Sequence, residues 1–216
     1  MDDNEAEINE VHEKSVATAR TLGLLSKDGR ARAPTLQFPM RLRANSKSFG
    51  AHHIGNYVDL ISTSSIKDFA CGKRSYKGHN GVDITLSPFW WRMMDAAEAE
   101  IVAAAPGRIV NKVDGNFDRQ CSLPAKSPAN LVEILQDDGI FAISGHLKKG
   151  SVIKQPIGSR VTAGQVLGLV GSSGNSVAPH LHFELRTASA FRGKTVDPYA
   201  GVLRRCWHLV AASARV

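Results

Sequence analysis

Short runs of alternating apolar and polar residues dominate the chain from Thr35 onward, and this alternation predicts β-strands. Glycine, proline and aspartate separate the runs, so a hairpin is expected at Asp137-Asp138-Gly139 and a break between two strands at Pro106-Gly107. The expected strands lie in TLQFPMRL, NYVDLIS, GVDITL, EIVAAAPGRIVNKV, ANLVEILQDDGIFAISGHL, SVIKQ, RVTAGQVLGLVG and LHFELR. Many short strands at close spacing predict an all-β fold, an antiparallel β-sandwich or open barrel.

The first part of the chain has a different pattern. Apolar residues between Ile8 and Leu22 fall near helical spacing, and Gly23 is a residue type that ends helices. A helix is therefore expected over residues 4–22, either as a linker from a larger protein or as an appendage packed on the main domain. A helical turn is also expected in FWWRMMDAAEAE, and the tail after Tyr199 gives no clear pattern beyond a short helix.

Composition indicates a globular chain. Its 216 residues are 43% hydrophobic and 22% charged, enough for one well-filled domain with additions or at most two small ones. No apolar run approaches the roughly 20 residues that span a bilayer, so no membrane span is expected in this chain. The acidic start, MDDNEAEINE, lacks the features of a signal peptide, which leaves the export route open.

The chain is basic, with a net charge of +7. This charge favours an anionic partner, which could be nucleic acid, an acidic membrane or an anionic cell-wall polymer, although ordinary surface charge explains it equally well. The basic residues are spread along the chain and form no dense tract or nucleic-acid-binding motif, so nucleic acid is not expected as the partner.

The three cysteines form no C-x-x-C pair, which argues against a zinc site made of thiolates. Cys71 and Cys121 lie in two loop-like regions, and a disulfide between them is expected in an oxidising compartment. Cys206 would then be left over, and three unrelated thiols are the alternative.

The stretch APHLHFELR places two histidines on one strand. Alternate side chains of a strand share a face, so His180, His182 and Glu184 would point one way. Leu181 and Phe183 would point to the core. The polar face therefore carries two rings that can bind metal, or it is simply a hydrated strand face.

Three further motifs supply partners for these histidines. In GHNGVDI, His79 and Asp83 lie four residues apart, and this imidazole and carboxylate suit a divalent transition metal, zinc above all. Gly81 between them would let the backbone fold so that both side chains reach one point. In FAISGHLKKGS, His146 ends a strand. The segment GQVLGLVGSSGNSV leads through a Ser/Gly/Asn loop into the paired histidines, with Pro179 at the entry to their strand.

Together, these four motifs resemble those of the lysostaphin-type zinc endopeptidases of bacterial cell walls. The family order is H-x-x-x-D, a strand-end H-L, G-Q-x-x-G-x-x-G and P-H-L-H-F-E, and all four occur here in that order. The resemblance runs from about Phe38 to Tyr199 and includes VDPY near its end. It implies an all-β metallopeptidase domain, with the short helical segment as an N-terminal extension.

The resemblance also implies roles for five residues. His79, Asp83 and His182 would be the ligands of one zinc ion per chain, and His146 and His180 would be the catalytic pair. Three protein ligands leave one position for water, as a catalytic zinc site requires. Which of the two catalytic histidines moves which proton is left open.

The implied function is a zinc-dependent endopeptidase that hydrolyses cross-bridge or stem peptides of peptidoglycan, in the periplasm or outside the cell. Residues 35–200 would be the peptidase domain, 1–34 a helical extension or linker, and 201–216 a tail. Two alternatives stay open. One is a latent or non-catalytic module that activates another wall hydrolase, its site blocked by the extension, a loop, or an asparagine or histidine ahead of His79, for instance His52 or His53. The other is a secreted antibacterial effector with the same chemistry. The sequence identifies no regulatory or immunity partner.

Some residues depart from the family pattern. Ser144 stands where many members have a tyrosine, which removes an aromatic wall. Residues 121–130 look like an insertion, and insertions of this kind form walls of substrate grooves. Trp90 and Trp91 are expected to pack in the core rather than line a groove. Glu184 is expected to orient an imidazole of the site, with a solvated carboxylate as the alternative.

Overall fold

The computed structural model describes residues 3–25, 35–44, 46–61, 64–188 and 195–200. In these residues the elements are α1 Asp3–Thr21, β1 Met40–Leu42, β2 His52–Asn56, β3 Val82–Leu86, α2 Trp90–Asp95, β4 Ala99–Val102, β5 Gly107–Val113, β6 Leu131–Gln136, β7 Ile140–Gly145, β8 Arg160–Val161, β9 Val166–Leu169, β10 His180–Thr187 and β11 Thr195–Val196. Among them, neither helix has the length and apolar character needed to cross a bilayer.

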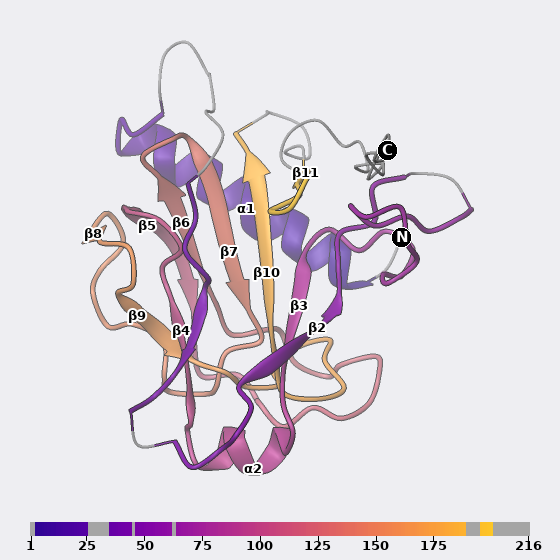
Figure 1. The fold of residues 1–216 in the computed structure, drawn as a ribbon. Helices are drawn as coiled ribbons and strands as arrows, with labels where there is room; N and C mark the ends of the chain where they lie inside the picture. The colour runs from indigo at the N-terminus through magenta and orange to yellow at the C-terminus, as the bar shows by residue number, and fades with distance from the viewer. Residues whose placement is uncertain (1–2, 26–34, 45, 62–63, 189–194, 201–216) are drawn as a thin grey trace, which may run out of the picture.

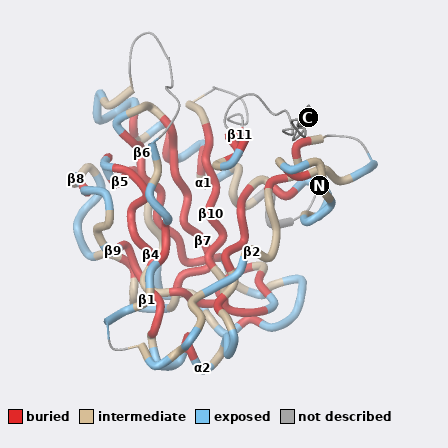
Figure 2. The backbone as a smooth tube through the Cα atoms, in the orientation of Figure 1, coloured by how far each residue is buried: buried red, intermediate tan, exposed pale blue. Residues whose placement is uncertain are grey.

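The strands form two antiparallel sheets. The larger sheet has the order β2-β3-β10-β7-β6-β5-β8, with β11 paired to β10, and the smaller sheet has the order β1-β4-β9. Apolar residues of both sheets make the main core, and the central strands β6 and β7 are buried along their whole length (Figures 1 and 2). The predicted all-β antiparallel fold is confirmed.

The alternation on β10 divides the two faces of the larger sheet as its sequence predicts. Leu181, Phe183 and Leu185 lie in the main core. The intervening residues His182, Glu184 and Arg186 face the other way and are also buried. The second face of the sheet must therefore be covered by something other than the smaller sheet.

Helix α1 covers part of that second face, behind β5, β6, β7 and β10 in the view of Figure 1. Val16 and Ala19 of α1 pack against Val110, Leu135 and Phe141 of the sheet in a second apolar cluster. The predicted helix is confirmed. Of the two interpretations left open by the sequence, the described residues fit a segment packed on the main domain.

Two predicted strands are wrong. NYVDLIS does not continue β2, because its backbone bonds to a loop: Tyr57 N donates to Arg74 O and Leu60 N to Lys67 O. The apolar alternation there is real, since Val58 and Leu60 are buried, but it serves packing rather than a strand ladder. The segment SVIKQ, residues 151–155, likewise forms no strand. The expected helical turn is α2.

The predicted Cys71–Cys121 disulfide is wrong. Cys121 is a free, exposed thiol. Cys71 is disulfide-bonded, so it is not bonded to Cys121. Spacing alone could not distinguish the partners, because a disulfide requires two Cβ atoms about 4 Å apart, which depends on the tertiary fold. The tail after Tyr199, apart from Ala200, also lies outside the described residues.

Candidate metal and catalytic site

Pairing of β3 with β10 brings together the residues predicted to bind metal. Asp83 and His182 are directly opposite each other in this antiparallel pair, and His79 lies in the turn that leads into β3. The three side chains are almost completely buried. They form the one group of three or more histidine, cysteine or carboxylate side chains close enough for a metal ion in the described part of the chain.

The three ligand atoms form a nearly equilateral triangle. Asp83 Oδ1 lies 3.1 Å from His79 Nε2 and 3.1 Å from His182 Nδ1, and the two nitrogens are 3.3 Å apart. Ligands about 2.0–2.1 Å from a tetrahedral zinc ion are about 3.3 Å from one another. Two imidazole nitrogens and a carboxylate oxygen are also ligands that zinc accepts. The residues present therefore fit zinc in both spacing and chemistry.

The outer nitrogen of each imidazole is already held. His79 Nδ1 lies 2.9 Å from the carbonyl oxygen of Tyr57, and His182 Nε2 lies 3.1 Å from Glu184 Oε2. An N–H on each outer nitrogen leaves His79 Nε2 and His182 Nδ1 with lone pairs toward the centre of the triangle. Metal-binding histidines are typically fixed in this way. Glu184 is fully buried, so the alternative of a solvated carboxylate is wrong.

Gly81 makes room for one of these rings. A methyl group on Gly81 would lie 2.5 Å from His182 Cε1 and 2.6 Å from its Nε2. Gly81 does not have the positive φ that favours glycine, whereas Gly78, just before His79, has φ 78°. The chain bends at Gly81 as expected, without a positive φ, and Gly81 also permits the close approach of His182.

Backbone carbonyl groups of the loop between β9 and β10 bind the two histidines that were predicted to be catalytic. His146 Nδ1 lies 2.6 Å from Ser173 O, and His180 Nδ1 lies 2.7 Å from Ala178 O. His146 follows β7 with a left-handed backbone, φ 63°, which is strained for a residue with a side chain. The two ring centroids are 4.6 Å apart, and His180 Nε2 is 3.6 Å from Asp83 Oδ1.

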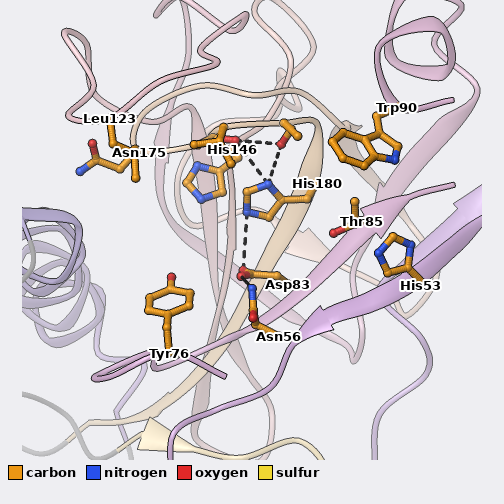
Figure 3. Close-up of a pocket in the computed structure, with 13 residues that line it drawn as sticks. His53, Asn56, Tyr76, Asp83, Thr85, Trp90, Leu123, His146, Asn175 and His180 are labelled. Atoms are coloured by element: carbon orange, nitrogen blue, oxygen red, sulfur yellow. Dashed lines mark hydrogen bonds and ion pairs between the residues drawn. The ribbon is translucent and has the colours of Figure 1, made fainter. Parts of the chain in front are cut away.

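These side chains open into a pocket of about 480 Å³. Asp83, His146 and His180 line it, and His180 lies directly above Asp83 in Figure 3. His79 and His182 are buried and are not among the described residues that line it. Of the triangle, Asp83 therefore borders the pocket together with the two further imidazoles.

The pocket walls correct two expectations. Trp90 lines the pocket and is 43% exposed, so the prediction that it packs in the core is wrong, whereas its neighbour Trp91 does pack against the core. Ser144 is buried and is not among the described residues that line the pocket. Leu123, from the segment read as an insertion, forms part of the wall as expected.

Two other lining residues contact the ligand side chains directly. Tyr76 stacks on the ring of His79 with centroids 4.4 Å apart, and Asn56 Nδ2 donates to Asp83 Oδ2 at 2.9 Å. Asn56 is one of the asparagines ahead of His79 suggested as blocking groups, whereas no signal marks Tyr76, because its contact depends on the loop path before His79. Of the histidines suggested as blocking groups, His53 lines the pocket and His52 stacks on a phenylalanine. Helix α1 supplies none of the described lining residues.

Burial keeps the two catalytic candidates uncharged at neutral pH. It lowers the pKa of His146 well below that of an ordinary histidine, and the repulsion that protonated His180 and His182 would exert lowers it further. Burial also lowers the pKa of His180, against the opposing charge of Asp83. Neutral imidazoles can accept protons, so both side chains are suited to proton transfer.

The ligand His182 and its partner Glu184 favour their charged forms instead. Burial opposes a charge on His182, yet its hydrogen bonds to Asp83 and Glu184 outweigh burial and raise its pKa to about 9. Burial likewise opposes ionisation of Glu184, but the charge of Arg186 and the contact with His182 outweigh it, and its pKa is about 2. Below about pH 9 a metal ion must therefore displace a proton from His182.

We expect zinc to stabilise the chelator-treated protein, and more strongly as the pH rises from 6 to 8. A ligand at about 100 times its Kd adds about 2.7 kcal/mol to the free energy of unfolding, which is about 5–10 °C in Tm for a chain of this size. The pH dependence follows because His182 must lose a proton on binding. Thermal unfolding with and without zinc at both pH values measures this, and no zinc-dependent shift at either pH would contradict the site.

Comparison with known proteins agrees with the geometry. Glycyl-glycine endopeptidase ALE-1 of Staphylococcus capitis is 40% identical over 70 residues, which are 32% of this chain and 18% of that protein. DD-carboxypeptidase/endopeptidase Mpg of Neisseria meningitidis is 38% identical over 74 residues, 34% of this chain and 15% of that protein. The matched stretches thus span less than a fifth of these relatives.

Among solved structures, the catalytic domain of the antimicrobial peptidase lysostaphin from Staphylococcus simulans matches with a TM-score of 0.44 and 23% identity. The match covers 68% of this chain and 89% of that one. The sequence model described as peptidase family M23 matches residues 77–198, more than half of the chain and the part that holds the triangle and both further histidines. The chain therefore belongs to peptidase family M23.

Proposed function

We propose that this protein is a zinc-dependent endopeptidase that hydrolyses peptide bonds in bacterial peptidoglycan. The observation that supports this most directly is the triangle of His79, Asp83 and His182, spaced as for a tetrahedral zinc ion. Asp83 lines a pocket together with His146 and His180, two neutral imidazoles. Because the chain belongs to a peptidase family, the reaction proposed for this arrangement is hydrolysis of a peptide bond.

The proposed mechanism divides the work between the two groups of side chains. Bound to the triangle, zinc would lower the pKa of a water molecule and polarise the scissile carbonyl group. One of His146 and His180 accepts the proton of the attacking water, and the other stabilises the developing oxyanion or protonates the leaving amine. The carbonyls of Ser173 and Ala178 fix each Nδ1, so each Nε2 is presented to the substrate.

The proposed substrate is a peptide of the cell wall, in a cross-bridge or a stem. The names of the relatives, a glycyl-glycine endopeptidase and a DD-carboxypeptidase/endopeptidase, support this class without selecting one bond. A net charge of +7 suits an anionic wall polymer. Such a substrate places the working enzyme in the periplasm or outside the cell, and a secreted antibacterial effector would use the same chemistry.

Digestion of purified cell walls tests this proposal. Walls of several cross-bridge types are incubated with the protein, and released fragments are identified by mass spectrometry, which also gives the bond that is cut. We expect peptide release that stops on treatment with a chelator and returns with one equivalent of zinc. If the zinc-loaded protein releases no peptide from any wall type, the proposed activity is wrong.

A further inference from the structure

The polar row on β10 does not end at the metal ligand. His182, Glu184 and Arg186 point to the same face of the sheet, and the row runs from the buried side of the metal triangle to the region under α1. Glu184 is fully buried and Arg186 is 2% exposed. Charged side chains this deeply buried require partners, so the contacts of Arg186 are informative.

An unbroken chain of hydrogen bonds joins the metal ligand to the helix. Glu184 binds His182 Nε2 through Oε2 at 3.1 Å and accepts from Arg186 Nε through Oε1 at 2.5 Å. Arg186 Nη1 in turn donates to Asn9 Oδ1 of α1 at 2.6 Å. The carboxylate of Glu184 is thus held between the guanidinium and the imidazole, and the position of the guanidinium depends on Asn9.

Helix α1 is fixed next to this chain by polar contacts of its own. His12 is buried, with Nδ1 2.7 Å from Glu133 Oε1 and Nε2 3.2 Å from Thr187 O, the residue after Arg186. Ser15 is also buried and donates to the other oxygen of Glu133. Polar side chains buried in this way define the position of a helix more narrowly than apolar packing does, because each contact has a required distance and angle.

We propose that Asn9 is a positioning residue for the zinc ligand His182, acting through Arg186 and Glu184, and that α1 is therefore part of the metal site. This inference rests on the proposed function only as far as zinc binding. A guanidinium that lost the oxygen of Asn9 would have a buried N–H without that acceptor and would shift toward another. Glu184 would follow it, and the ring of His182 would lose the acceptor that sets its orientation.

The test compares zinc affinity, measured by chelator competition, among variants of the full chain. We expect Asn9→Ala to bind zinc about threefold to tenfold more weakly than the unchanged protein, less than the 10–100-fold typical of a direct partner of a ligand such as Glu184. The visible spectrum of the cobalt(II)-loaded protein should change as well, because it reports the arrangement of the ligands. Asn9→Asp keeps an acceptor oxygen opposite Arg186 and should bind zinc within twofold of the unchanged protein.

Ser15→Ala is the matched control. It removes a buried hydrogen bond from the same face of the same helix, so it should lower Tm as much as Asn9→Ala does, yet it lies outside the chain that leads to His182. Its zinc affinity and cobalt spectrum should be unchanged. Equal zinc affinities for Asn9→Ala and Ser15→Ala would overturn the inference and leave the proposed function intact. Failure of the unchanged protein to bind zinc would overturn both.

Discussion

We expect the His180→Ala protein to release wall peptides at least about 100-fold more slowly than the unchanged protein while it still binds one zinc ion. Proton transfer by a positioned side chain typically contributes about 100-fold to 10,000-fold to the rate of a reaction. His180 is suited to this task because it lines the pocket, its Nδ1 is fixed by Ala178 O, and burial keeps its ring neutral. It is not one of the three ligands, so the zinc content should be unchanged.

Two measurements separate this outcome from a general loss of structure. Peptide release is followed by mass spectrometry on purified walls, and zinc is quantified in the same samples. His53→Ala is the matched control, since it removes an imidazole from the exposed edge of the same pocket, and its activity should stay within about threefold of the unchanged protein. If the His180→Ala protein kept a third or more of the activity, the catalytic role of His180 would be refuted.

Part of the fold and site could be predicted from local patterns. The alternation in APHLHFELR placed His182 and Glu184 on one face of a strand and Leu181 in the core, as β10 does. The hairpin of β6 and β7 and the helix α1 also follow from local patterns. Local patterns could not show that Asp83 lies beside His182, because the two are 99 residues apart. Only the resemblance to a known family placed them at one metal site.

The contacts that orient the site have no signal in the sequence. The carbonyl oxygens of Tyr57, Ser173 and Ala178 each hold a histidine of the site, and every residue has such an oxygen. Which carbonyl is used depends on the path of the loops. Trp90 was wrongly placed in the core because it begins the short helix α2, and neighbouring residues of a helix point in different directions, so Trp91 packs against the core while Trp90 is exposed. The role proposed for Asn9 could likewise not be predicted from the sequence, because its partner Arg186 is 177 residues away.

The Gly81→Ala protein should lose zinc and, with it, all wall-digesting activity. The added methyl group would lie 2.5 Å from His182 Cε1 and 2.6 Å from His182 Nε2, both closer than a methyl group can approach, and 3.0 Å from Phe183 O, which is a tight contact. Moving the ring takes His182 Nδ1 out of the triangle and Nε2 away from Glu184. We therefore expect zinc affinity to fall by at least about 100-fold, at or beyond the upper end of what loss of a ligand's partner costs, with a loss of about 1–3 kcal/mol in stability from overpacking.

Gly145→Ala tests whether the effect comes from this contact or from any added methyl group near the ligand. Gly145 also faces His182, but there the methyl group would lie 3.6 Å from His182 Cβ, an ordinary van der Waals distance. Its zinc affinity, measured by chelator competition, should stay within about threefold of the unchanged protein.

Full zinc occupancy in Gly81→Ala would show that the ring of His182 can move without leaving the metal, and would contradict the claim that Gly81 is required at this position. Equal losses in both variants would show instead that the pairing of β10 with its neighbours, not the close approach at Gly81, limits binding.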